Sequence, residues 1–165
     1  FWSILYRNDL HQEQELINFF CQENYVVYRD NYLPQAEYYS KEMGDQKLLS
    51  KFYLIDQNPR NRETLVAEKL RSVDLENKFS NDGKRQVNID PGYICHENVI
   101  LTSGKNYGHR VYLFDGVFYE LELLYRNQTF EILPWTYPDY QNPEVIEFLN
   151  WNRSHLVQKL IKKNS

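Results

Sequence analysis

Short strand-like segments separated by turn sequences fill residues 85–133, and no other feature constrains the fold as strongly. The dipeptide Asp115-Gly116 is the clearest turn, because both residues tolerate the positive φ angles of a type I′ hairpin. Strands joined by a two-residue turn pair in antiparallel fashion. We therefore expect an antiparallel sheet in this half of the chain, with the strand 109–114 paired to the strand 117–126.

Further strand and turn signals complete this half of the chain. The segment 85–90 alternates apolar and polar residues, and the dipeptide that follows it, Pro91-Gly92, is typical of a turn. The segments 98–103 and 129–133 are rich in apolar and β-branched residues, which favours strands.

The first half of the chain alternates strands with helices. The segments 1–6 and 25–28 are predicted strands, and Leu10–Gln22 is a predicted helix with Asp9 as its N-cap. A β-α-β unit of this kind usually has parallel strands, with the helix packed over one face. The segment 30–45 shows no clear period, and long loops of this kind are often functional.

Two more helices are predicted from the spacing of apolar residues. One spans residues 62–79, after a predicted strand at 48–55, and the other spans residues 144–162. The inward side of the first would carry Leu65, Val66, Leu70 and Val73. Together the elements predict one domain over residues 1–165, of the α+β class. Its mixed, mostly antiparallel sheet would have about six to seven strands, with helices mainly on one face.

Composition narrows the setting and the partners. The chain carries 19 Lys and Arg against 23 Asp and Glu, a net charge of −4, whereas domains that bind duplex nucleic acid usually present a positive surface. Cys21 and Cys95 match no metal or redox spacing, so we expect two reduced, buried thiols in a cytoplasmic protein. No apolar run reaches the ~18 residues of a membrane span, so no membrane partner is expected. Because the chain does not begin with Met, we expect further residues before Phe1.

The predicted hairpin brings a histidine beside acidic residues. A two-residue turn places His109 opposite Glu122, on the same sheet face as Glu120. A His beside carboxylates can transfer protons or bind a metal. The alternative is an ordinary cross-strand ion pair on a solvent-facing surface. No third ligand is identifiable, so we expect neither a metal site nor a cofactor.

The loop before this hairpin is suited to an anion. Gly104 and Gly108 bracket it, and Lys105, His109 and Arg110 supply positive charge within a few residues. Backbone N–H groups near glycines can approach a phosphate or a carboxylate. The alternative is a surface loop whose glycines serve only the turn geometry. A phosphate loop of the GTPase type is improbable, because the positions of its first Gly and of its Ser or Thr hold Val99 and Asn106.

Three other segments combine an acid with aromatic residues, as ligand pockets do. They are 38–44 with Glu42, 88–93 with Asp90 and 135–140 with Asp139. The alternative makes the acids turn formers and the Tyr residues a packing layer. Three such segments in one small domain favour a site.

The same segments resemble an uncharacterised bacterial family, domain of unknown function 4416. The resemblance rests on residues 38–44, 87–93, 109–113 with Lys105, and 135–140, in that order along nearly the whole chain. Val73 stands where the family would have Asn. Some members carry a GTP-binding label, which the missing motifs do not support here, so the resemblance implies no established activity. It does select the positions Lys41, Glu42, Asn88, Asp90, Tyr93, Lys105, His109, Arg110, Tyr137 and Asp139.

The leading hypothesis is a pocket for an anionic small molecule, phosphorylated or not, that the protein binds and could also convert. In this hypothesis Lys41, Lys105 and Arg110 hold the anion, His109 or Asp90 transfers a proton, and Tyr93 and Tyr137 wall the pocket, with Glu42, Asn88 and Asp139 as further ligand-binding residues. It requires Lys41, Asp90, Lys105 and His109 to converge on one cavity. The main alternative is a non-catalytic interaction module that uses exposed Tyr and Trp side chains. A third interpretation is binding of single-stranded nucleic acid, and the oligomeric state stays open.

Overall fold

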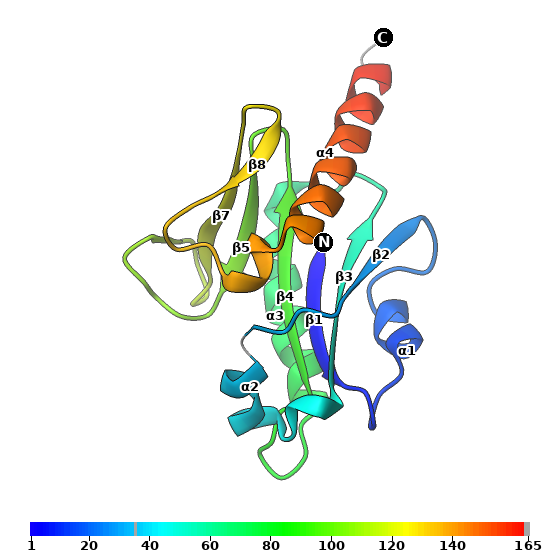
Figure 1. Ribbon diagram of the computed structural model, residues 1–165, viewed down its shortest axis with the longest axis vertical. Helices are drawn as coiled ribbons and strands as arrows, with labels where there is room; N and C mark the ends of the chain where they lie inside the picture. The colour runs from blue at the N-terminus through cyan, green and yellow to red at the C-terminus, as the bar shows by residue number, and fades with distance from the viewer. Residues whose placement is uncertain (35, 164–165) are drawn as a thin grey trace.

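The computed structural model describes residues 1–34 and 36–163, which form an α+β fold around one sheet (Figure 1). The described strands follow the order β2-β3-β1-β4-β5-β7-β6. Strand β8 also pairs with β7, on the edge that β6 uses but farther along the strand. Every pairing between neighbouring described strands is antiparallel. The turn sequences predicted this for the second half of the chain, whereas the sheet as a whole was expected to be mixed and mostly antiparallel. The strands are β1 (Trp2–Arg7), β2 (Tyr25–Asp30), β3 (Leu49–Asp56), β4 (Val87–Ile94), β5 (Asn98–Ser103), β6 (Arg110–Tyr112), β7 (Phe118–Arg126) and β8 (Thr129–Ile132).

Helices cover both faces of this sheet. They are α1 (Glu13–Asn18), α2 (Ala36–Met43), α3 (Leu65–Lys78) and α4 (Pro143–Lys163), with short 3-10 turns at Gln46–Leu48, Arg62–Thr64 and Pro138–Gln141. Phe52 and Leu54 of β3 pack with α1 and α3, whereas the alternate residues Tyr53 and Ile55 pack with α4. Successive strand residues point to opposite faces, so α1 and α3 share one face and α4 covers the other (Figure 1).

The opening β-α-β unit has the expected parallel strands, but they do not touch. β1 and β2 are each antiparallel to β3, which lies between them. The predicted helix start at Leu10 is wrong. α1 begins at Glu13 after Gln12, and the Asp9 carboxylate accepts hydrogen bonds from the Arg7 guanidinium at 2.8 and 2.7 Å instead of capping the helix. The segment 30–45, predicted as a loop, contains α2.

Helix α3 turns a partly polar face toward the sheet. The buried residues on this helix are Leu65, Val66, Lys69, Ser72, Leu75 and Glu76. Leu70 and Val73 are 40% and 39% exposed, so their predicted inward placement is wrong. The apolar pattern misplaced the buried face because Lys69, Ser72 and Glu76 occupy it and satisfy their polar groups there.

The hairpin at Asp115-Gly116 contains one more residue than predicted. Both turn residues have positive φ angles, 51° and 73°. The Leu113 N–H donates to the Val117 carbonyl, and the Val117 N–H donates to the Phe114 carbonyl, which leaves Phe114 as an extra residue. Arg110 therefore faces Glu120 instead of Leu121, and the predicted pairing of His109 with Glu122 is wrong by one position.

Strand β4 runs straight through Pro91-Gly92, where a turn was predicted. Residues 87–91 pair with β1, and residues 92–94 pair with β5, so the strand extends its pairing to a second neighbour at this dipeptide. Pro91 has no N–H to donate to β5. Gly92 lets β5 approach closely, because a Cβ at this position would lie 2.4 Å from the Ile100 carbonyl oxygen. Before Pro91, β4 and β5 are no longer paired.

Candidate functional site

A cavity of about 1010 Å³ opens where β4 and β5 stop pairing. Small-molecule sites usually occupy cavities of roughly 300–1,000 Å³. Its lining comes from β1, β3, β4, β5, β6, β7 and α3, from Arg85, from the loop 104–109 and from the segment 135–140. It also includes Tyr32, Leu33, Pro34, Tyr39 and Lys41. Segments far apart in the sequence therefore meet here. We call the Asn88-Asp90 side with Lys69 and Arg85 the β4 wall, and the side formed by Ser103, Lys105, His109, Arg110 and Glu120 the β5 wall.

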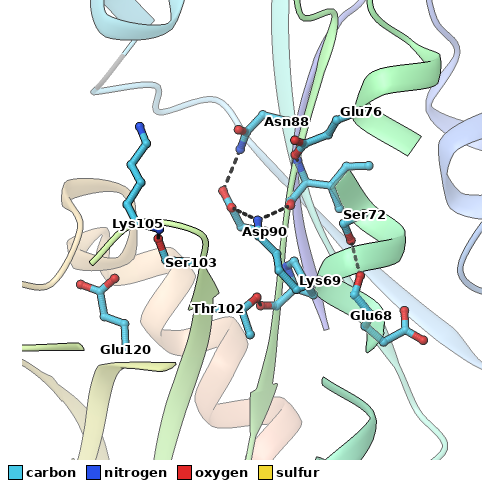
Figure 2. Close-up of polar contacts among 12 residues, drawn as sticks. Glu68, Lys69, Ser72, Glu76, Asn88, Asp90, Thr102, Ser103, Lys105 and Glu120 are labelled. Carbon is cyan, nitrogen blue, oxygen red and sulfur yellow. Dashed lines mark hydrogen bonds and ion pairs between the residues drawn. The ribbon is translucent and has the colours of Figure 1, made fainter. Parts of the chain in front are cut away.

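The β4 wall is a chain of hydrogen bonds, and Figure 2 shows its part from Asn88 through Asp90 to Lys69. The Arg85 guanidinium donates to Asn88 Oδ1 at 2.7 Å, and Asn88 Nδ2 donates to Asp90 Oδ2 at 2.7 Å. Lys69 reaches from α3, and its Nζ lies 3.2 Å from Asp90 Oδ1 and 3.3 Å from the Ile89 carbonyl oxygen. Both carboxylate oxygens of Asp90 are therefore occupied, and Lys69 balances its charge.

Arg85 also binds Glu42, which does not line the cavity. The guanidinium pairs with the Glu42 carboxylate and lies 3.7 Å from the Glu76 carboxylate. Glu76 is itself buried, and its Oε1 accepts a hydrogen bond from the Ile89 N–H at 2.5 Å. Burial raises the pKa of Glu76 above its usual value, with Lys69 acting in the opposite direction. Glu42 thus acts on the β4 wall from outside, through Arg85.

The β5 wall is organised around the buried guanidinium of Arg110, whose side chain is 4% exposed. Its nitrogens donate to Glu120 Oε2 at 2.9 Å, to Ser103 Oγ at 2.9 Å and to the Lys105 carbonyl at 2.8 Å. A fourth bond runs to the Tyr137 hydroxyl at 2.6 Å. All three guanidinium nitrogens are thus engaged with protein acceptors, and Arg110 ties the loop 104–109 to β7 and to the segment 135–140.

His109 is held by a carboxylate on one side and by an aromatic ring on the other. Its Nε2 lies 2.6 Å from Glu120 Oε1, and its ring stacks on Trp135 with centroids 5.2 Å apart and planes 11° from parallel. Glu120 is buried, so the His109–Glu120 contact is not the solvent-exposed ion pair of the alternative interpretation. A carboxylate that fixes the imidazole leaves His109 suited to proton transfer at the cavity surface.

Two ionisable side chains of this region, Lys51 and Glu122, are more buried than His109. Lys51 of β3 forms an ion pair with Asp139, and its Nζ lies 4.9 and 5.6 Å from the ring centroids of Tyr53 and Tyr140. Burial lowers the pKa of Lys51 to about 8, although Asp30 and other carboxylates act in the opposite direction.

Glu122, adjacent to this region on β7, is fully buried. Its Oε1 accepts a hydrogen bond from the Tyr137 N–H at 2.6 Å, and its Oε2 has no partner among the described residues. Burial raises the pKa of Glu122 to about 8, and that of Tyr137 to about 12. The Glu122 carboxyl is therefore protonated at neutral pH.

Comparison with models of known protein families identifies the family of this chain. The model of the family described as "Domain of unknown function (DUF4416)" matches residues 1–155 of the 165. The chain belongs to this family. Neither the curated proteins nor the solved structures gave a match.

Of the ten positions selected from the DUF4416 resemblance, eight line the cavity and two do not. Those that line the cavity are Lys41, Asn88, Asp90, Lys105, His109, Arg110, Tyr137 and Asp139. Two do not: Glu42 binds Arg85, and Tyr93 lines a smaller cavity of about 330 Å³. Lys41, Asp90, Lys105 and His109, whose convergence the single-site hypothesis requires, are all in the lining of the larger cavity. Tyr38 was part of the matching segment, and its side chain lies outside the described residues.

Sequence reasoning on this DUF4416 chain missed Lys51, Lys69 and Arg85. The available signal was a charged residue at an apolar position of a regular pattern. Lys51 lies two residues from each of the buried Leu49 and Tyr53 and so shares their face of β3. Lys69 lies four residues after the buried Leu65, on the same side of α3. A charge on a buried face needs a partner, and this requirement points to a site.

Neither a metal-binding cluster nor a membrane-spanning helix is present in residues 1–34 and 36–163. No group of three or more His, Cys, Asp or Glu side chains in these residues is arranged to hold a metal ion. No helix in them is long and apolar enough to cross a membrane. Cys21 and Cys95 are both buried and form no disulfide.

Proposed function

We propose that the cavity between the β4 wall and the β5 wall binds an anionic small molecule, with phosphorylated compounds as the leading class. The observation that carries the proposal is a local excess of positive charge. Of the described residues in the lining, Lys41, Lys51, Lys69, Arg85, Lys105 and Arg110 are basic, against the three acids Asp90, Glu120 and Asp139. The whole chain has a net charge of −4, so the lining differs in sign from the rest of the protein.

The lysines are better placed to contact the anion than the arginine is. Arg110 donates from all its nitrogens to protein groups and so positions the loop 104–109. Lys105 lies on that loop, Lys41 lies near the end of α2, and both are exposed residues of the lining. Ammonium groups are common ligands of phosphate. We assign the anion contact to Lys41 and Lys105, and the positioning of the loop to Arg110.

Any reaction in the cavity would use His109 as the proton carrier. Its contact with Glu120 at 2.6 Å and its stacking on Trp135 fix the ring at the lining. Asp90 has both oxygens bound by Asn88 and Lys69, so it is less available to accept a proton. The proposal covers binding, and catalysis would be a further property of the same site.

Thermal unfolding in the presence of inorganic phosphate, nucleotides and phosphosugars tests the proposal. A ligand at a hundred times its Kd stabilises the folded state by about 2.7 kcal/mol. For a domain of this size the melting temperature should then rise by roughly 5–10 °C. Lys105→Ala should weaken this shift, and Lys47→Ala, an exposed lysine outside the lining, should leave it unchanged. The proposal fails if no anion shifts the wild-type protein, or if both variants respond equally.

A second candidate function is protein–protein interaction through the β6 hairpin. Val111, Tyr112 and Phe114 are 66%, 58% and 53% exposed. Large apolar side chains gathered on a surface often mark interaction sites. In this case no anion would raise the melting temperature, and Tyr112→Ser would reduce self-association measured by sedimentation velocity.

A further inference from the structure

Lys51 places a buried amine in the cavity lining. It lies on β3, paired across the sheet with Leu5 of β1 and Asp30 of β2. Its side chain is only 9% exposed, and yet it belongs to the cavity lining. Two tyrosine rings lie beside its Nζ, and Asp139 is its ion-pair partner. A lysine in these surroundings is costly to bury and is not needed to satisfy the backbone of a regular strand.

The surroundings of Lys51 differ from those of the other lysines in the lining. Lys69 donates to a backbone carbonyl as well as to Asp90, so its amine is tied to β4. Lys41 and Lys105 are exposed to solvent. Lys51 alone among these four combines burial, aromatic neighbours and a carboxylate that can take its proton. A buried lysine with these properties is suited to covalent catalysis through its neutral amine.

We infer that Lys51 forms an imine with an anionic aldehyde or ketone, whose negatively charged group is held by Lys41 and Lys105. This inference rests on the proposed function, because the anion site must first bring the carbonyl group to the amine. It narrows the ligand class to compounds that carry both a carbonyl and a phosphate or carboxylate.

The chemistry balances with the groups present. The Lys51 ammonium gives a proton to the Asp139 carboxylate, and the neutral amine attacks the carbonyl carbon to form a C–N bond. The carbonyl π electrons move to oxygen, and Asp139 returns that proton to this oxygen. The Asp139 carboxylate then takes a second proton from the nitrogen, which gives a neutral carbinolamine. Asp139 gives this second proton to the hydroxyl, which leaves as water, and the nitrogen lone pair forms the C=N bond of a protonated imine. The net change is one amine and one carbonyl converted to one imine and one water, with no oxidant or reductant.

Pyridoxal 5′-phosphate is a suitable probe, because it carries an aldehyde and a phosphate on one small molecule. The full chain is incubated with the probe at pH 7.5 and reduced with borohydride, which fixes any imine as a stable amine. Digestion and mass spectrometry then locate the label. We expect roughly tenfold or more label at Lys51 over the exposed Lys47, because a neutral amine reacts and a charged one does not. Excess inorganic phosphate should suppress the Lys51 label and leave the Lys47 label unchanged.

The outcomes separate the inference from the proposed function. Label at Lys41, Lys69 or Lys105 in place of Lys51, with phosphate protection, overturns the inference and leaves the anion site standing. Label at exposed lysines only, with a phosphate-induced rise in melting temperature, has the same meaning. Absence of both phosphate protection and a thermal shift overturns both.

Two variants check the assignment. Lys51→Arg keeps the positive charge beside Asp139 but cannot form an imine, so the label should be lost while the thermal shift with phosphate is kept. Lys51→Met, read in the same assays, removes the charge as well as the amine, and the label at position 51 should again be lost. Lys47→Arg is the matched control and should lose only its own surface label. If Lys51→Arg lowers the label at every site equally, the effect is structural and the inference fails.

Discussion

Replacing Glu122 with Gln should remove a large pH dependence from the free energy of unfolding. Glu122 is 0% exposed, and burial raises its pKa from 4.5 to about 8, with the charge of Glu120 acting in the same direction. The folded state therefore holds this proton more tightly than the unfolded state does. The stabilisation is fully present below pH 4.5 and is lost as the pH rises toward 8.

The magnitude follows from these two pKa values. Each pH unit in this window costs about 1.4 kcal/mol. Between pH 5 and pH 7.5 the wild-type protein should lose roughly 3 kcal/mol through this residue. Gln keeps the size of the side chain and the acceptor for the Tyr137 N–H, but it cannot ionise. The variant should escape this loss and become the more stable protein at the higher pH.

Urea unfolding of both proteins at pH 5 and pH 7.5 measures the effect. The difference in unfolding free energy between variant and wild type should grow by roughly 3 kcal/mol across this range. Glu147→Gln, on the exposed side of α4, is the control and should follow the wild-type pH dependence. An equal difference at both pH values would refute the reasoning, because Glu122 would then be ionised in the folded state or not buried.

Two further changes should lower stability for separate reasons. Arg110→Met leaves the Glu120 carboxylate buried without its main partner, and urea unfolding should show a loss of about 3–5 kcal/mol; a loss under 1 kcal/mol would mean that water reaches Glu120. Gly92→Ala places a Cβ 2.4 Å from the Ile100 carbonyl oxygen, and the melting temperature should fall with a loss of roughly 1–3 kcal/mol. An unchanged melting temperature would show that β4 and β5 can move apart at no cost.

The sequence predicted the α+β class and the antiparallel sheet because turn residues and alternation are local signals. It did not predict the register at Asp115-Gly116. The extra residue Phe114 shifts the register by one position and brings Arg110 opposite Glu120, where the two side chains form a buried ion pair. A pattern that assigns charged residues to the solvent side cannot anticipate such a pair. The turn expected at Pro91-Gly92 was also wrong. Pro and Gly occur in turns, but here they lie within a strand at the point where its paired neighbour changes, and the local sequence does not distinguish the two cases.

The candidate site likewise contains residues that the sequence indicated and residues that it did not. Residues in loops beside glycines and aromatics, such as Lys105 and Tyr137, stood out in the sequence. Lys51 and Lys69 lie within regular elements, and each becomes notable only through a partner distant along the chain. Lys51 meets Asp139 across 88 positions, and Lys69 meets Asp90 across 21. No local pattern records such a contact, so the buried lysines required the fold.

The change of partner along β4 has a mechanical consequence. Asn88 and Asp90 belong to the half of the sheet built on β1, whereas Ser103 and Glu120 belong to the half built on β5 and β7. The backbone pairs at 92–94 are the seam between the halves. A molecule that contacts both the β4 wall and the β5 wall would restrict the opening of these backbone pairs. Its binding should therefore slow amide hydrogen exchange at Leu101 and Ile94, even if it contacts the backbone of neither residue.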